Sequence, residues 1–133
     1  RFFIQAVPSS VVMTPEKEFL LQIAPSTQLF HGSLPFNRTE RQKALKVAMK
    51  QIGKPYAIDF QKPPNQFYCS SLVEYIYQPF TFIHDVFHLL FVPQSFWKQY
   101  YASLNESVPN TTGSNPTLLM HSPIVNLTKI SPK

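Results

Sequence analysis

The stretch Phe67-Tyr68-Cys69-Ser70-Ser71-Leu72-Val73 follows a polar, proline-containing loop at residues 54–67. The change in composition predicts a helix that begins near Cys69 and runs to about Tyr77, before Pro79. A thiol at the first turn of a helix faces unpaired backbone N–H groups and the positive end of the helix dipole, and both stabilise a thiolate. This stretch therefore presents a candidate nucleophile.

Cys69 is the single cysteine of the chain, and a small buried apolar residue is the alternative role for it. A cysteine hydrolase also needs a histidine that takes and returns a proton, and a third group that orients the imidazole. Among the four histidines, His31 is the first candidate for such a base. His84 and His88 have the spacing of a metal pair, but no third ligand is evident, so core or rim positions are favoured and no metal site is expected.

The length and composition limit the remaining classes of protein. A chain of 133 residues with 44% hydrophobic residues predicts one domain with its own core. One cysteine excludes an internal disulfide and cysteine-rich metal sites. The three glycines form no GxGxxG or GxxxxGK[ST] motif, so no phosphate-binding loop or cofactor is expected. No apolar run reaches the length of a transmembrane helix.

The formal net charge of +5 leaves two interpretations open. A basic domain that binds nucleic acid would show strongly salt-dependent binding. The basic residues are scattered, however, and Lys43, Lys46 and Lys50 share one face of an expected helix, which is typical of a solvated surface. The sequence therefore favours a soluble basic domain without a nucleic-acid partner.

Short apolar segments and two separated helices alternate along the chain. Strands are expected at residues 2–7, 11–13 and 28–31, and a helical turn at 15–21. A helix is expected at 40–52, with Thr39 as its N-cap and Gly53 as the residue that ends it. The apolar pairs at 118–119 and 124–125 predict one or two edge strands near the C-terminus. This mixture predicts the α+β class.

Three groups of residues resemble a known family when they are taken in order. Gly53-Lys54-Pro55-Tyr56, then Asp59-Phe60, then Tyr68-Cys69-Ser70-Ser71-Leu72-Val73 are similar to the signature of circularly permuted NlpC/P60 cysteine hydrolases, in particular the YiiX/YebB-like subgroup. The resemblance covers most of residues 2–125. It implies a papain-like α+β fold with permuted topology, in which a small antiparallel sheet or barrel packs against helices.

The resemblance also assigns roles to individual residues. Cys69 matches the nucleophile. Gln5 stands at the polar position after the strand of the family's histidine, where an amide oxygen would orient the imidazole; a polar residue on the outer face of an edge strand is the alternative. Tyr56, Tyr68 and Ser70 are expected to line the cleft, although each tyrosine also suits a core position with a satisfied hydroxyl.

The chain departs from the family at the catalytic histidine. The family's histidine lies on a strand upstream of the one that holds Gln5, and here no histidine precedes His31. The first interpretation is that residues 1–133 form a single domain that is incomplete at its N-terminus, with its histidine and first strands upstream of Arg1. The alternatives are that His31 is a substitute base or that the protein is inactive.

The activity implied by the resemblance is that of a cysteine peptidase or amidase that attacks an amide-type bond. The implied substrates are bacterial cell-wall peptides, other peptides or an acylated, lipid-like molecule, and the implied location is periplasmic or secreted. A catalytically inactive module that binds a lipid or a peptide on the same fold is the alternative from another functional class. The sequence does not indicate an oligomeric state.

Overall fold

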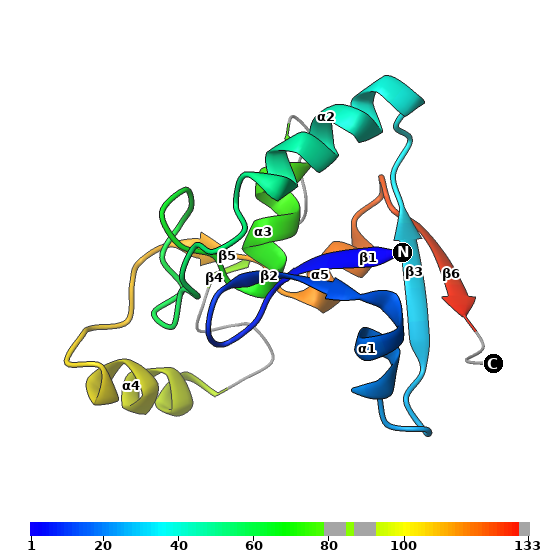
Figure 1. Cartoon of the computed structure of the whole chain (residues 1–133). Helices are drawn as coiled ribbons and strands as arrows, with labels where there is room; N and C mark the ends of the chain where they lie inside the picture. Colours follow the sequence, from blue (N-terminus) through cyan, green and yellow to red (C-terminus); the bar gives the residue numbers. More distant parts are fainter. Residues whose placement is uncertain (79–84, 87–92, 131–133) are drawn as a thin grey trace.

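A computed structural model describes residues 1–78, 85–86 and 93–130 (Figure 1). The elements follow in the order β1 (Phe2–Ala6), β2 (Val11–Pro15), α1 (Glu16–Leu21), β3 (Leu29–Ser33), α2 (Arg38–Met49), α3 (Cys69–Ile76), β4 (Asp85–Val86), α4 (Gln94–Ser103), β5 (Thr112–Gly113), α5 (Pro116–His121) and β6 (Asn126–Ile130). Short strands and separated helices confirm the α+β class. The helix that begins at Cys69 is also confirmed.

The described strands pair as three antiparallel two-stranded sheets. β1 pairs with β2 as a hairpin, β4 pairs with β5, and β3 pairs with β6. The β3–β6 ribbon joins residues 29–33 to residues 126–130, so two strands that are far apart in the sequence lie side by side. The resemblance implied a small antiparallel sheet or a barrel. The described part of the chain shows small antiparallel sheets and no closed barrel.

The main core lies between the β1–β2 hairpin and α3. Ala6 and Val11, which are paired across the hairpin, are buried together with Phe67 and Leu72. Leu72 is on the second turn of α3, so this packing fixes the helix against the hairpin. Figure 1 shows α3 between α2 and the hairpin, and α3 contacts β1, α2 and α5.

The start of α2 differs from the expectation, because its N-cap is Asn37 and not Thr39. The Asn37 side-chain oxygen accepts a hydrogen bond from the Glu40 backbone N–H at 3.0 Å, and the Glu40 carboxylate accepts one from the Asn37 N–H at 2.7 Å. This reciprocal capping box starts the helix two residues earlier than predicted. Thr39 therefore lies inside the first turn.

The C-terminal expectation of an edge strand at residues 118–119 is wrong, because Leu118 and Leu119 belong to α5. Asn115 caps this helix by accepting a hydrogen bond from the Leu118 N–H at 2.8 Å, and Pro116 occupies the first turn, where a missing N–H costs nothing. The strand expected at 124–125 instead begins at Asn126, as β6.

Candidate active site

The N-terminus of α3 holds Cys69 at the surface on a firmly anchored backbone. The Ser71 hydroxyl accepts a hydrogen bond from the Tyr68 N–H and donates one to the Tyr68 carbonyl, both at 2.9 Å. Tyr68, Ser70 and Ser71 are buried, whereas Cys69 is exposed. The thiol is thus open to a substrate while the residues on either side of it are held in the interior.

Tyr56 is brought to Cys69 by a short backbone connection. A parallel bridge pairs Tyr56 with Phe67, and the Ala57 N–H donates to the Phe67 carbonyl at 2.9 Å. Burial, followed by the charge of Cys69, raises the pKa of the Tyr56 hydroxyl, although a hydrogen bond from the Cys69 backbone N–H lowers it. The phenol therefore remains protonated at neutral pH, and its hydroxyl lies beside the backbone N–H of Cys69.

Tyr68 links the start of α3 to the segment after β5. Its hydroxyl accepts a hydrogen bond from the Ser114 backbone N–H at 3.4 Å, and its ring meets Phe60 edge to face, with centroids 5.2 Å apart. Burial is the main cause that raises the pKa of Tyr68. The role of Ser114 was not predicted, because 46 residues separate it from Tyr68 in the sequence.

Ser70 faces the interior of the protein. Its side-chain oxygen is buried and has no hydrogen-bond partner among the residues that the structure describes. The residue is 2% exposed, so its hydroxyl does not share the solvent-facing side of Cys69.

Gln5 and His31 lie on different sheets, and neither makes a hydrogen bond to Cys69 within the described ranges. The Gln5 side-chain amide donates to the Thr14 hydroxyl at 3.0 Å, and alternation along β1 puts Gln5 on the face opposite its neighbour Ala6, which packs in the core. His31 is exposed on β3, opposite Thr128. Their catalytic roles stay predictions.

Two tyrosines of α4 donate hydrogen bonds to the loop that follows Tyr56. The Tyr100 hydroxyl donates to the Ile58 carbonyl, and the Tyr101 hydroxyl donates to the Asp59 carbonyl at 2.7 Å. Burial, followed by the charge of Asp59, raises the pKa of Tyr101 to about 12. These contacts were not foreseen, because 42 residues separate the partners.

The described residues contain no group of three or more His, Cys, Asp or Glu side chains placed to hold a metal ion. The pair His84 and His88 lies outside these residues. In the same described part, no helix is both long and apolar enough to cross a membrane.

Comparisons with known proteins agree with this fold. A family model for the permuted papain-like amidase enzymes, YaeF/YiiX, C92 family, matches residues 1–130. The crystal structure of the metalloprotein YiiX from Escherichia coli O157:H7 is similar, with a TM-score of 0.77 and 22% sequence identity over 99% of this chain and 76% of that chain. This identity shows the fold alone. No curated protein matches the sequence.

The YiiX crystal structure is described as that of a metalloprotein. Because its described residues bring no three metal-ligating side chains together, they do not fit a resident metal ion.

Proposed function

The chain belongs to the permuted papain-like amidase family, YaeF/YiiX, C92, and from this membership we propose that it is a cysteine amidase whose nucleophile is Cys69. One observation carries the proposal. The exposed thiol stands at the first residue of α3, and the backbone N–H of the same residue meets the Tyr56 hydroxyl.

In the first step the Cys69 thiolate attacks the carbonyl carbon of an amide, so that a C–S bond forms and the carbonyl electron pair moves to oxygen. The Tyr56 hydroxyl accepts the Cys69 backbone N–H, and in this proposal its own O–H donates to the oxyanion that develops beside the sulfur. The positive end of the α3 dipole favours both the thiolate and the oxyanion.

In the second step the C–N bond breaks and a histidine gives its proton to the leaving amine, after which water hydrolyses the thioester. We propose that this histidine lies upstream of Arg1 and is oriented by Gln5, with His31 as the alternative base. The proposed substrates are peptide amides of the cell wall or acylated amines. The aromatic neighbours Tyr56, Tyr68 and Phe60 suit an apolar or planar group beside the scissile bond.

The single cysteine makes the experiment direct. Wild-type protein is incubated with short cell-wall peptides and N-acyl amino acids, and the release of free amine is measured before and after alkylation with iodoacetamide. Alkylation or Cys69→Ala is expected to abolish amine release, and mass spectrometry is expected to find the acyl adduct on the peptide that contains Cys69.

The matched control is the double variant Cys69→Ala with Thr117→Cys, which moves the thiol to an exposed position on α5. This variant is expected to be alkylated but inactive. Amine release that survives complete alkylation, or that persists in Cys69→Ala, would rule out Cys69 as the nucleophile.

A further inference from the structure

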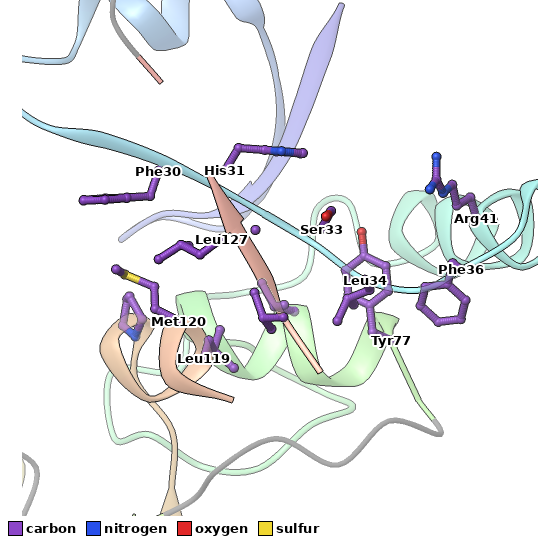
Figure 2. Close-up of a pocket in the computed structure, with 14 residues that line it drawn as sticks. Phe30, His31, Ser33, Leu34, Phe36, Arg41, Tyr77, Leu119, Met120 and Leu127 are labelled. Atoms are coloured by element: carbon purple, nitrogen blue, oxygen red, sulfur yellow. The ribbon is translucent and has the colours of Figure 1, made fainter. Parts of the chain in front are cut away.

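The candidate nucleophile lies outside a cavity of about 590 Å³ between the β3–β6 ribbon and the helices α3 and α5 (Figure 2). His31 and Tyr77 help to line this cavity, and neither Cys69 nor Tyr56 is among its lining residues. The contact of Cys69 that bears on the proposed reaction is instead made by the loop at residues 54–67, which carries Tyr56.

The base of the loop at residues 54–67 is closed by backbone hydrogen bonds on both sides of Tyr56. The Phe67 N–H donates to the Pro55 carbonyl at 3.1 Å, and the Ala57 N–H donates to the Phe67 carbonyl at 2.9 Å. Phe67 and Ala57 are fully buried. These bonds fix Tyr56 on the side that faces Phe67, and the chain that continues from Ala57 into the loop is held by other contacts.

Two consecutive tyrosines of α4 bond to two consecutive carbonyls of this loop. The Tyr100 hydroxyl donates to the Ile58 carbonyl, and the Tyr101 hydroxyl donates to the Asp59 carbonyl at 2.7 Å. A hydrogen bond to a carbonyl is directional, so each bond orients one peptide unit, and here the two units are adjacent. The tyrosine pair, Tyr100 and Tyr101, therefore holds the loop in orientation as well as in position.

The helix α4 is itself packed firmly enough to hold the loop. Tyr101 and Trp97 are 1% and 6% exposed, and Val108 and Leu118 pack against them. Leu118 belongs to α5, so α4 is fixed against a second helix. The tyrosine pair thus acts from a closely packed element.

The backbone is strained directly after the two bonded carbonyls. Phe60 has a φ of 57°, in the left-handed region that a residue with a bulky side chain rarely adopts. Its ring meets those of Tyr68, Trp97 and Tyr100, with centroids 5.2, 5.6 and 5.8 Å away. Such a conformation persists only where the surrounding structure holds it, and strained residues are concentrated at functional sites. The strain points to a functional requirement on this turn.

The Asp59 carboxylate serves the same turn. It accepts hydrogen bonds from the Gln66 side-chain amide at 3.1 Å and from the Gln61 N–H at 3.3 Å. Within the described ranges no Lys or Arg forms an ion pair with it. Asp59 and Phe60, which resemble part of the family signature, thus act on one turn: the carboxylate closes the loop, and the ring packs the turn against α4.

This turn is joined to the tyrosine that meets Cys69. The Ile58 N–H donates to the Tyr56 carbonyl at 3.1 Å, so Tyr56 is bonded to the residue that Tyr100 holds. The Tyr56 hydroxyl accepts the Cys69 backbone N–H. Burial, followed by the charges of Cys69 and Tyr100, raises the pKa of Tyr56, so the three groups lie close to one another.

We propose that Tyr100 and Tyr101 are positioning residues, which hold residues 56–60 so that the Tyr56 hydroxyl stays beside the backbone N–H of Cys69. The catalytic consequence rests on the proposed amide hydrolysis, in which Tyr56 donates to the oxyanion. The placement of Tyr56 does not depend on catalysis and is measured separately.

The single cysteine provides a direct probe of this placement. The full chain labelled with 15N-cysteine gives one amide peak, that of Cys69, and its proton shift reports the hydrogen bond to Tyr56. Tyr56→Phe keeps the ring and removes the acceptor, so the proton resonance is expected to move upfield. Tyr101→Phe is expected to move it in the same direction by a smaller amount, because Tyr56 keeps its hydroxyl and loses part of its support.

The matched control is Tyr75→Phe, which removes the same atom from a residue of α3 itself. The Tyr75 ring packs against Phe67, and its hydroxyl makes no hydrogen bond within the described part of the chain. This variant is expected to leave the Cys69 peak in place. A Tyr101→Phe peak that coincides with the wild-type peak, or a Tyr56→Phe peak that does not move, would overturn the proposal.

Should Tyr101→Phe fail to fold, Tyr100→Phe takes its place, because Tyr100 is less buried and bonds to the neighbouring carbonyl. The expected upfield shift of the Cys69 proton is the same in direction. An unmoved peak in this variant would contradict the proposal in the same way.

A cycle of variants in the amine-release assay tests whether the pair acts through Tyr56. Tyr56→Phe is expected to lower kcat about 100-fold, as the loss of one oxyanion donor does. Tyr101→Phe is expected to lower kcat about tenfold with KM unchanged within about twofold, because a misplaced donor loses part of its effect. The double variant is expected to stay within about twofold of Tyr56→Phe. A further tenfold loss in the double variant would show that Tyr101 acts independently of Tyr56.

The two readouts separate this inference from the proposed function. The expected amide shifts in a protein that releases no amine would contradict the hydrolysis and support the placement of Tyr56 by α4. Amine release that depends on Cys69, without an amide shift in Tyr101→Phe, would support the hydrolysis and overturn the role of the tyrosine pair.

Discussion

Ser70 and Ser71 allow a direct test of how the start of α3 is held. Both residues are buried, at 2% and 5% exposure, and Ser→Ala removes the same single oxygen from each. The Ser71 hydroxyl bonds to the N–H and to the carbonyl of Tyr68, whereas the Ser70 oxygen has no partner among the described residues. The two variants therefore differ mainly in hydrogen bonding.

The two substitutions are expected to change the free energy of unfolding differently: Ser71→Ala lowers it, whereas Ser70→Ala leaves it unchanged or raises it. Ser71→Ala leaves the buried Tyr68 N–H without its acceptor, and an unsatisfied buried donor costs about 1–3 kcal/mol. The Tyr68 carbonyl keeps the hydrogen bond from the Leu72 N–H at 3.1 Å, so we expect a loss near the middle of that range, about 2 kcal/mol. Ser70→Ala removes a hydroxyl that is buried without compensation, so we expect no loss or a gain of up to about 1 kcal/mol.

Urea unfolding followed by circular dichroism measures both variants beside the wild type. With a slope of about 2 kcal/mol/M, their midpoints are expected to differ by about 1–1.5 M, provided that the slopes agree. Ser95→Ala, exposed on α4, controls for the general gain in helix propensity. If Ser70→Ala loses as much stability as Ser71→Ala, the reasoning is refuted, because the Ser70 hydroxyl must then be hydrogen-bonded.

The remaining predictions concern α2 and α4. Asn37→Ala is expected to lower the free energy of unfolding, measured with urea, by about 1 kcal/mol because α2 loses its cap. Thr39→Ala is expected to change it by less than about 0.5 kcal/mol. The opposite ranking would restore Thr39 as the cap. Because burial raises the pKa of Tyr101 from 10.0 to about 12, its contribution to stability is complete below pH 10 and is lost as the pH rises toward 12. Thermal melts across this range are expected to show a smaller decline in Tyr101→Phe, and identical declines would assign the effect to other groups.

The elements that the sequence predicted correctly are those with local signals. The helix at Cys69 follows a change from a polar loop to apolar spacing, and Pro15 precedes α1, where proline suits the start of a helix. The cap of α2 was misplaced for a local reason as well. Two capping boxes overlap there, Asn37 with Glu40 and Thr39 with Gln42, and their residue types alone do not decide between them.

The edge strand predicted at residues 118–119 was wrong because the segment is too short to show a periodicity. Two adjacent apolar residues at 118–119 define neither a period of two nor one of 3.6. The preceding Asn115-Pro116 is a cap followed by a proline suited to the first helical turn, and it was the better signal.

The contacts around Cys69 could not be predicted from the spacing of residues along the sequence. Tyr68 and the Ser114 N–H meet across 46 residues, and Tyr101 and the Asp59 carbonyl meet across 42. Such pairs depend on how the helices pack, which local propensity does not determine. The sequence therefore indicated a candidate nucleophile and its aromatic neighbours, whereas the tertiary hydrogen bonds required the structure.

The core fixes the helix α3 between its two ends. Its eight residues span roughly 12 Å. Cys69 stands at the first turn and Tyr77 just past the last, while Leu72 between them is fixed in the core against the β1–β2 hairpin. Close packing and the Ser71 hydrogen bonds hold the first turn, so the backbone N–H of Cys69 is fixed relative to the β1–β2 hairpin. The position of the candidate nucleophile is therefore set by the core.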